Sequence, residues 1–596
     1  MSKFVIGIDL GTTNCVIAYS PLGVDKADVR ILPIPQLVAP AVIENRDSLP
    51  SFLYLPTDTE LQGTDYTFGE KTKKKPISVA GEIARKKTAD VPDRSISAAK
   101  SWLCHSKVDR RQPILPWNAP ESVTKISPLT ATQRYLEHLI KTWNNTFPDA
   151  PIAQQEIVLT VPASFDASAR ELTREAAIAA GLPENNLVFL EEPQAAIYAW
   201  LNEVGDSWRK NLRLGNTLLV CDVGGGTTDL TLVGVEQEEG DLILKRIAVG
   251  EHLLVGGDNM DLALAHYASE LLNELGTNLN PWQSVALWHS CREAKESLLD
   301  GNKAGKPYPV SVLGRGKKLI GGTISVDLDG EKASEILRSG FFPICDKTDK
   351  PKRRGLVGFR EIGLPFEQDT AITRHLGAFL FSHDAMPTHV LLNGGVFKAA
   401  ALRQRLFEVL DAWFPSQKVE HVQSQSGLDH SVAFGAAYYG WMKLRGGIRI
   451  RGGTARSYYV GIETAGLAVP GAPRPLKAIC VAPFGMEEGT SADVPGGEIG
   501  LVVGETAHFR IFSSTVRKED KPGDVLDSSH ITSQTADLQE TDSMETLLSA
   551  NDTADDYVPV KFHTNVTELG IMELWCDSTI SEQCWKLEFS VRNEDA

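Results

Sequence analysis

Apolar runs and short polar turns alternate from the first residues of the chain. One apolar run covers residues 4–10, a Gly/Thr turn follows, and a second apolar run covers residues 14–19. Apolar runs of this length, bounded by glycine and small polar residues, are typical of strands buried in a sheet. The chain is therefore predicted to begin with two buried strands joined by a tight turn.

Helical spacing appears further along and alternates with predicted strands. Residues 129–147 place their large apolar side chains on one helical face, and residues 156–161 form an apolar strand. A helix is predicted to begin after Asp166, a good N-cap residue, and to end at Gly181. A short strand at residues 188–190 and another helix follow. This alternation predicts an α/β domain.

The opening pattern returns at residues 218–233. There an apolar strand ends in Asp222, as the first strand ends in Asp9, and each aspartate precedes a Gly/Thr turn and a second apolar strand. Such turns can hold phosphate oxygens, and a carboxylate beside them can hold the accompanying metal. A plain β-hairpin explains either copy taken alone. The recurrence instead favours two similar subdomains that hold a phosphate chain and a metal between them.

Two further glycine pairs precede predicted helices, Gly256-Gly257 and Gly394-Gly395. Bare amides at a helix N-terminus can bind an anion, although a glycine pair alone is a weak signal. Lys295 lies on a predicted helix over residues 282–299, where surface charges at helical spacing explain it equally well.

The composition changes after residue 445. Residues 446–456 are rich in glycine and arginine and are predicted to be a linker between a domain at 1–445 and a second domain at 457–596. Alternating runs in the second domain predict antiparallel strands and an all-β sandwich, with clear examples at 457–462, 507–512, 558–563 and 585–591. Residues 518–557 are acidic and rich in serine and threonine, and are expected to form a long, partly disordered loop.

Composition then narrows the possible functions. The chain has 596 residues, 42% hydrophobic and 23% charged, and a formal net charge of -17. The negative charge argues against binding to nucleic acid or to an anionic membrane surface. We also expect neither a membrane span nor a secretion signal. The eight cysteines form no CxxC pair, which indicates neither a zinc site nor a disulfide framework. A cytoplasmic protein is expected.

Five motifs occur in the order found in the heat-shock 70 (DnaK-type) chaperones, and the chain resembles that family. They lie at residues 9–14, 161–165, 192–193, 222–229 and 432–437. The first and fourth motifs are specific for actin-like ATPases, and the second and third narrow the resemblance to the chaperone branch. The resemblance covers residues 1–445 well. It implies a duplicated, ribonuclease H-like α/β fold of two lobes, with ATP or ADP and Mg²⁺ bound between them.

The resemblance also implies a role for each matching residue. The metal would be held by Asp9 and Asp222. The phosphates would be cradled by Gly11, Thr12, Thr13, Asn14, Gly224, Gly225 and Gly226. The γ-phosphate and the attacking water would be contacted by Lys100, Glu192, Thr227 and Asp229. The ribose and adenine side would be lined by Gly256, Gly257, Lys295, Gly394, Gly395 and Lys398. The nucleotide state would be relayed to the second domain by Pro162 and Arg170.

The chain departs from the family pattern in three places. On the adenosine side Arg292 replaces a glutamate, Leu299 replaces a serine, and Lys398 replaces an arginine that stacks on adenine. Arginine and lysine are not equivalent when stacked, so the base contacts are expected to differ from those of the family. The linker is Gly/Arg-rich instead of apolar, and no helical lid is expected after the β-rich domain.

Three functions remain open at this point. The leading hypothesis is a divergent ATP-dependent chaperone that hydrolyses Mg-ATP slowly in its first domain and binds unfolded or extended polypeptide in its second. A J-domain co-chaperone and a nucleotide-exchange factor would be its partners. The alternative is a nucleotide-binding co-chaperone or scaffold with little turnover. A small-molecule kinase of the actin-like superfamily is the third, against which the β-rich second domain and the context of Lys100 argue.

Overall fold

The structure is a computed structural model of the whole chain, which divides into two compact units, Met1–Arg449 and Ile450–Ala596. Within the residues described, no helix is both long enough and apolar enough to cross a membrane. The structure describes residues 2–57, 59–60, 78–105, 107–117, 119–238, 241–299, 306–314, 322–352, 364, 366–422, 424, 427–445, 450–451, 454, 456–463, 476–487, 489–504, 506–514, 516–517, 519–527, 529–532, 537–547, 557–567 and 571–590.

The first sheet of unit 1 is built around the opening hairpin. Strand β1 (Phe4–Leu10) runs antiparallel to β2 (Asn14–Pro21) and parallel to β10 (Glu156–Val161). Strand β11 (Leu187–Glu191) extends the sheet beyond β10, and β3 (Arg30–Ile31) extends it beyond β2. The strand order is β11-β10-β1-β2-β3, and β6 (Leu49–Pro50) also pairs with β2.

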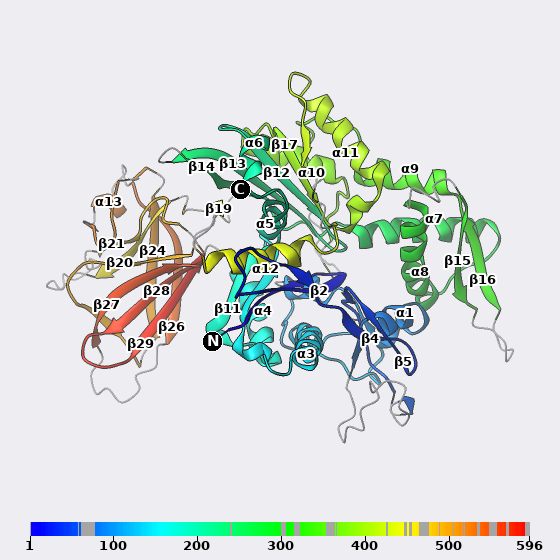
Figure 1. Cartoon of the computed structure of the whole chain (residues 1–596), viewed down its shortest axis with the longest axis horizontal. Helices are drawn as coiled ribbons and strands as arrows, with labels where there is room; N and C mark the ends of the chain where they lie inside the picture. The colour runs from blue at the N-terminus through cyan, green and yellow to red at the C-terminus, as the bar shows by residue number, and fades with distance from the viewer. Residues whose placement is uncertain are drawn as a thin grey trace. The chain divides into compact units, whose positions relative to one another are not determined.

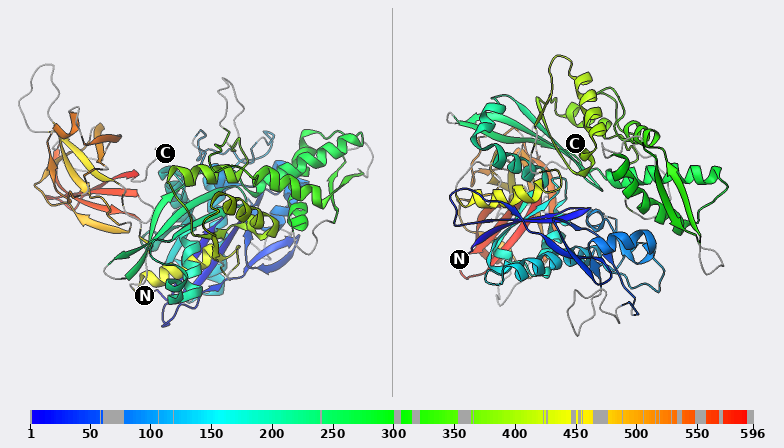
Figure 2. Two further views of the ribbon diagram at one scale, coloured as in Figure 1. Left: turned by 90° about the horizontal axis from the view of Figure 1, so that it is seen from above. Right: turned by 45° about the vertical axis from the view of Figure 1, so that its right-hand side comes forward.

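The second sheet repeats this topology with later segments. Strand β12 (Thr217–Val223) runs antiparallel to β13 (Thr228–Glu238) and parallel to β17 (His389–Asn393). Strand β14 (Asp241–Val249) follows β13, and β18 (Glu420–Val422) follows β17, in the order β18-β17-β12-β13-β14. The two hairpins can be followed by colour in Figures 1 and 2, β1 and β2 in blue and β12 to β14 in green. The predicted duplication is thus confirmed at the level of strand order.

Helices cover these sheets and connect their strands. They are α1 (Glu82–Asp90), α2 (Ala99–Leu103), α3 (Pro128–Thr146), α4 (Ala167–Ala180), α5 (Glu192–Val204), α6 (Trp208–Asn211), α7 (Gly257–Glu274), α8 (Pro281–Leu299), α9 (Gly330–Phe341), α10 (Ile372–Ser382), α11 (Ala400–Trp413) and α12 (Ser431–Lys443). The predicted caps of α4 are confirmed, because the Asp166 side chain accepts a hydrogen bond from the Ala169 amide and Gly181 adopts a φ of 107°.

Smaller strand groups complete unit 1. They are the pair β4 (Ile34–Ala39) and β5 (Val42–Arg46), the set β7 (Leu53–Tyr54), β8 (Val79–Ala80) and β9 (Ser95–Ile96), and the pair β15 (Tyr308–Leu313) and β16 (Thr323–Leu328).

Helix α12 packs closely against α5 and β1, as Figure 1 shows in yellow beside the blue strands. Gly435 makes this approach possible, because an ideal Cβ there would lie 1.7 Å from the Ala195 carbonyl oxygen on α5. Ala433 and Ala437 of the same helix form a small buried cluster with Val16 and Ala18 of β2. This close packing ties the end of unit 1 to the opening hairpin.

Unit 2 consists mainly of two five-stranded sheets. One has the order β25 (Val525–Leu526), β21 (Leu476–Ala482), β20 (Ser457–Glu463), β24 (Thr506–Ser514), β26 (Gln539–Leu547). The other contains β22 (Thr490–Asp493), β23 (Ile499–Val502), β27 (Tyr557–Val566), β28 (Ile571–Ser578) and β29 (Cys584–Ser590). Val460 and Ile511 of the first sheet share one buried apolar cluster with Val560 and Leu574 of the second. A short strand β19 (Ile450–Arg451) and a helical turn α13 (Ser529–Thr532) complete the unit.

The acidic segment 518–557 differs from its prediction as one long loop. Strand β26 lies inside it and pairs antiparallel with β24, where Phe509 lies opposite Met544. Uncharged residues separate Glu540, Asp542 and Glu545 of β26, so no two acidic residues are adjacent in the strand. Residues 548–556 lie outside the described part of the chain. Of the predicted linker 446–456, only residues 450, 451, 454 and 456 are described.

Candidate functional site

The two Asp-bearing turns face each other in unit 1. An ideal Cβ at Gly225 would lie 1.9 Å from Thr13 Oγ1, and one at Gly226 would lie 2.8 Å from Thr12 Cγ2. The β1–β2 turn and the β12–β13 turn therefore touch, and only glycine fits at these two positions. Thr12 and Thr13 thus lie next to Gly226 and Gly225, with which they are predicted to cradle the phosphates.

The third glycine turn packs behind the second instead of leaving its amides free. At the start of α7, the Gly257 amide donates to the Gly224 carbonyl at 3.0 Å and the Asp258 amide donates to the Gly225 carbonyl at 2.7 Å. A Cβ at Gly256 would lie 2.7 Å from both of those carbonyl oxygens. The amides proposed to bind an anion are therefore used to fix the turn that carries Gly225.

The fourth glycine turn contacts the second aspartate. Asn393, the last residue of β17, donates from Nδ2 to Asp222 Oδ2 at 2.7 Å and accepts from Ser431 Oγ at 2.6 Å. Gly394 has a φ of 86°, and a Cβ there would lie 2.2 Å from the Val223 carbonyl oxygen. Sequence reasoning missed Asn393, although an asparagine at the end of a buried strand and before a glycine pair was a usable signal.

The surroundings of Asp9 and Asp222 disfavour the charged form of both carboxyl groups and raise their pKa values. Burial raises the pKa of Asp222 to about 8, with the Glu192 charge adding to the effect and the Asn393 hydrogen bond opposing it. Burial and Glu192 likewise raise the pKa of Asp9 to about 7, while Lys100 and a 3.3 Å hydrogen bond from Thr160 oppose that rise. A divalent cation beside these carboxylates would favour their charged forms. Mg²⁺ commonly uses one or two protein carboxylates together with phosphate oxygens, and this donor set fits it.

Lys100 and Glu192 form a buried ion pair in the same region. Lys100 lies on α2, Glu192 is the first residue of α5, and the Lys100 ammonium donates to Glu192 Oε1. Burial opposes the charge on Lys100, but the Glu192 and Asp9 carboxylates outweigh it and raise the lysine pKa. The structure therefore brings Lys100, Glu192 and Asp9 into one electrostatic group.

Thr227 and Asp229 flank the start of β13. The Thr227 carbonyl accepts from the Gly224 amide at 2.9 Å and so closes the glycine turn. Asp229 is 3% exposed and accepts a hydrogen bond from the hydroxyl of Ser164, which follows β10 of the first sheet. Sequence reasoning singled out Asp229 but missed Ser164.

Arg170 lies next to the segment that carries Pro162. Its guanidinium donates to the Ala163 carbonyl at 3.0 Å and lies 4.0 Å from Glu191 Oε1. Glu191 precedes Glu192, and it also accepts from Arg246 of the second sheet at 3.1 Å. The residues expected to relay the nucleotide state therefore lie in a buried network beside Glu192.

On the expected base side, Arg292 and Lys295 of α8 are held by two aspartates of α7. Arg292 Nη2 lies 2.6 Å from Asp258 Oδ1, and its Nε lies 3.1 Å from Asp261 Oδ2. Lys295 Nζ lies 2.7 Å from Asp261 Oδ1 and donates to the Gly257 carbonyl at 2.8 Å. The Arg292 guanidinium also lies 5.0 Å from the ring centroid of Phe52. The arginine that departs from the family pattern thus has its own acidic partners.

Lys398 lies on the 3₁₀ turn η6 (Gly395–Lys398) and is more than half exposed. Its ammonium lies 2.5 Å from Asp429 Oδ2. The structure thus gives Lys398 an acidic partner of its own, while an added Cβ at neighbouring Gly395 would meet nothing within 4 Å.

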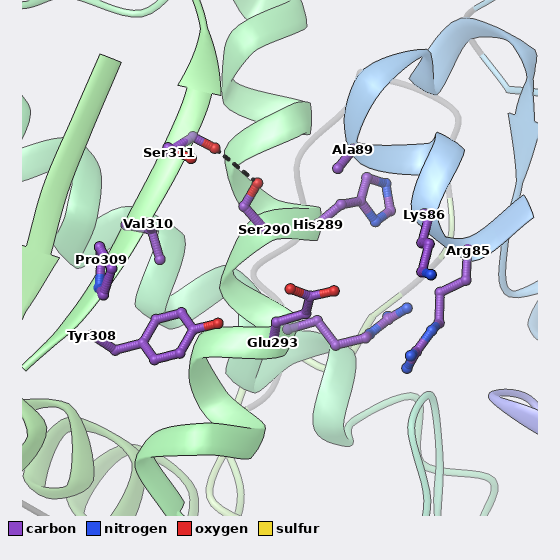
Figure 3. A pocket seen from close by; sticks show the side chains of 11 residues that line it. Arg85, Lys86, Ala89, His289, Ser290, Glu293, Tyr308, Pro309, Val310 and Ser311 are labelled. Atoms are coloured by element: carbon purple, nitrogen blue, oxygen red, sulfur yellow. Dashed lines mark hydrogen bonds between the residues drawn. The ribbon is translucent and has the colours of Figure 1, made fainter. Parts of the chain in front are cut away.

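A pocket of about 190 Å³ opens between α1 and α8, with β15 on its far side. Figure 3 shows Arg85 and Lys86 reaching in from α1 towards His289 and Glu293 on α8. Arg292 lines this pocket and also joins the Asp258 and Asp261 ion pairs, so the pocket borders the expected base side.

Part of this chain is similar to known proteins. A family model described as "Hsp70 protein" matches residues 78–325. A "Chaperone protein HscA homolog" of Acinetobacter baumannii (strain AYE) is 29% identical over 304 residues, which are 50% of this chain and 42% of that relative. A "Chaperone protein DnaK" of Stenotrophomonas maltophilia (strain R551-3) is 27% identical over 282 residues, 45% of this chain and 38% of the relative.

The matched stretches cover less than half the length of each relative. The segment that matches the family model, residues 78–325, carries β12, β13 and α8. Hsp70 proteins contain a two-lobed, actin-like nucleotide-binding domain, and the repeated strand order of unit 1 agrees with that architecture. Together with the motifs at residues 9–14 and 222–229, the matches confirm the resemblance of this chain to the Hsp70 family.

Proposed function

We propose that unit 1 binds Mg-ATP and hydrolyses it to ADP and phosphate. The observation that carries this proposal is the contact between the turns of Asp9 and Asp222, with the buried Lys100–Glu192 pair beside them. Phosphoryl transfer to water requires positioning and charge stabilisation more than covalent chemistry. The two glycine-rich turns can position the phosphates, and the buried ammonium and carboxylates can stabilise the charges.

Each side chain then has a specific task. Asp9 and Asp222 would hold a hydrated Mg²⁺, which neutralises phosphate charge when bound. Thr12 and Thr13 offer hydroxyl groups, and the Gly224–Thr227 turn offers backbone amides, for the phosphate oxygens. Lys100 provides a positive charge near the γ-phosphoryl group that is transferred to water. Glu192 and Asp229 orient the attacking water and accept its proton.

Single-turnover hydrolysis tests this function. The purified chain, loaded with Mg-ATP and freed of excess nucleotide, is expected to convert it to ADP, and Lys100→Ala is expected to slow that step at least about a hundredfold. Lys107→Ala is the matched control, because Lys107 is an exposed lysine a few residues after α2. ATP that binds but is not hydrolysed by the wild type would favour the nucleotide-binding co-chaperone or scaffold instead.

We further propose that unit 2 binds unfolded or extended polypeptide and that ATP in unit 1 controls this binding. Unit 2 has two antiparallel sheets with a shared apolar cluster, as a β-sandwich would. An extended peptide can add to such a fold through backbone hydrogen bonds and side-chain pockets. A J-domain co-chaperone and a nucleotide-exchange factor are the proposed partners, and the cytoplasm, which supplies ATP, is the proposed compartment.

Peptide binding has its own test. The fluorescence anisotropy of a labelled, extended apolar peptide should rise when the full chain is added, and Mg-ATP should lower the affinity. An affinity that does not change with ATP would overturn the coupling between the units. No detectable binding would overturn the chaperone function and leave the ATPase proposal to its own experiment.

A further inference from the structure

A hydrogen-bonded chain joins three side chains across the two sheets of unit 1. Ser164 lies in the turn between β10 and α4, Asp229 lies on β13, and His252 follows β14. The Ser164 hydroxyl donates to Asp229 Oδ1, and Ser164 Oγ lies 2.6 Å from His252 Nδ1. The hydroxyl donor to Asp229 therefore comes from the other lobe.

The number of hydrogens shared by Ser164, Asp229 and His252 determines which ring nitrogen of His252 is protonated. Ser164 has one hydroxyl hydrogen, and Asp229 receives it, so Oγ can only accept from His252. Nδ1 must then carry the imidazole hydrogen. His252 Nε2 is left as the bare ring nitrogen, and this buried atom has no hydrogen-bond partner among the described residues. The geometry thus requires the Nδ1–H tautomer.

The surroundings keep this imidazole neutral. Burial lowers the pKa of His252, and the positive charge of Lys100 on α2 lowers it further. The Asp229 and Asp166 carboxylates oppose that effect. The Phe165 ring meets the imidazole edge-on at a centroid distance of 5.8 Å. A neutral imidazole with one donor and one bare nitrogen suits a residue that orients a neighbour.

We propose that His252 is a positioning residue for ATP hydrolysis: it holds the Ser164 hydroxyl as a donor to Asp229 Oδ1 and leaves Asp229 Oδ2 to accept the proton of the attacking water. This inference rests on the proposed ATPase function. As the water oxygen bonds to the γ-phosphorus, the bond from that phosphorus to the bridging oxygen breaks and one water proton passes to Asp229. Because Ser164 and Asp229 belong to different lobes, Asp229 is fully oriented only when the lobes meet there.

The tautomer of His252 can be measured without nucleotide. In protein labelled with ¹⁵N-histidine, the His252 signals are identified by their loss in His252→Asn. We expect wild-type His252 to show a protonated Nδ1 and a bare Nε2. Ser164→Ala removes the acceptor, so the Nε2–H form should then rise. A predominantly Nε2–H imidazole in the wild type, or a tautomer unchanged by Ser164→Ala, would overturn the hydrogen-bond chain.

The role in hydrolysis is tested with a pair of His252 variants. Asn can place an amide donor near the Nδ1 position, whereas Leu cannot donate. We expect His252→Leu to slow single-turnover hydrolysis about tenfold to a hundredfold, the effect of losing one hydrogen bond near a charged group. His252→Asn should recover most of the rate, and ATP affinity should be unchanged in both variants. The acid limb of the pH–rate profile should move to higher pH in His252→Leu.

The failures of the two proposals are distinguishable. If the wild type hydrolyses ATP and both His252 variants match its rate and pH profile, the positioning role is wrong and the ATPase function stands. If His252→Asn is as slow as His252→Leu, the donor hydrogen is not what matters, and the role is likewise wrong. If the wild type does not hydrolyse ATP, the proposed function fails, while the tautomer measurement still decides the hydrogen-bond chain.

Discussion

The Lys100 ammonium and the Glu192 carboxylate form an ion pair in which the two residues are only 8% and 9% exposed. Two buried charges stabilise a fold only while each has its partner, because removing one leaves the other uncompensated. The pair therefore has a structural effect that can be separated from its proposed role with ATP.

Lys100→Met should lower the free energy of unfolding of the nucleotide-free chain by about 3–5 kcal/mol. Adding Glu192→Gln should recover most of this loss, because the double variant buries no unpaired carboxylate. Urea denaturation followed by tryptophan fluorescence measures all three proteins, with Lys107→Met as the exposed control. A double variant that is less stable than Lys100→Met would contradict this account.

Asp222 should make the metal-free chain less stable as the pH rises. Its pKa is about 8 in the folded chain, against about 3.9 in an unfolded one. Between these values the folded state keeps a proton that the unfolded state has released, so stability falls as pH rises through this window. Asp222→Asn has no such proton. The melting temperature of Asp222→Asn minus that of the wild type should therefore increase by about 2 °C or more between pH 5 and pH 8.

This measurement is made in EDTA, because a bound cation favours the charged carboxylate. Adding Mg²⁺ and ADP at pH 8 should then stabilise the wild type more than Asp222→Asn. A constant difference between the two proteins across the pH range would show that Asp222 ionises freely. Equal stabilisation of both by Mg²⁺ and ADP would argue against Asp222 as a metal ligand.

Gly225→Ala should weaken nucleotide binding at least about tenfold, because the new methyl group would lie 1.9 Å from Thr13 Oγ1 and push the two turns apart. Gly23→Ala is the matched control, since a Cβ at Gly23 meets nothing within 4 Å and Gly23 follows β2, outside the turns assigned to the nucleotide. Combining Gly225→Ala with Thr13→Ala should restore part of the affinity by removing the clashing oxygen. Titration with a fluorescent ADP analogue measures each affinity. Unaltered binding by Gly225→Ala would show that the turns need not approach closely.

Much of the fold could be predicted because its strands are apolar and because helix α4 begins and ends at recognisable cap residues. The hairpins ending in Asp9 and Asp222, helix α4 and the alternating strands of unit 2 all follow from local pattern. Strand β26 could not, since its acidic composition resembles that of a loop and only pairing with β24 makes it a strand. Tertiary pairing overrides local propensity in such a segment.

Some residues of the candidate site could likewise be predicted from the sequence, and others could not. Asp9, Asp222 and the glycines belong to contiguous motifs, so their sequence neighbours identify them. Ser164 and His252 come from two separate turns, and nothing in either turn indicates that they meet at Asp229. The partners of Arg292 were missed for the same reason, because Asp258 and Asp261 lie on a different helix.

Arg292 should matter for stability as well as for the expected base side. Its guanidinium bridges Asp258 and Asp261 and is only 7% exposed, so Arg292→Glu would place a third acid among buried carboxylates. We expect Arg292→Glu to lower the free energy of unfolding by about 3 kcal/mol or more. Arg292→Lys should lower it less, because lysine keeps the positive charge but cannot contact both aspartates as the guanidinium does. Arg46→Glu is the control, because Arg46 forms an exposed surface pair with Glu44 that is worth about 1 kcal/mol at most. Thermal and urea melts of the nucleotide-free chain measure the series. Arg292→Glu as stable as Arg46→Glu would mean that the two aspartates do not depend on Arg292.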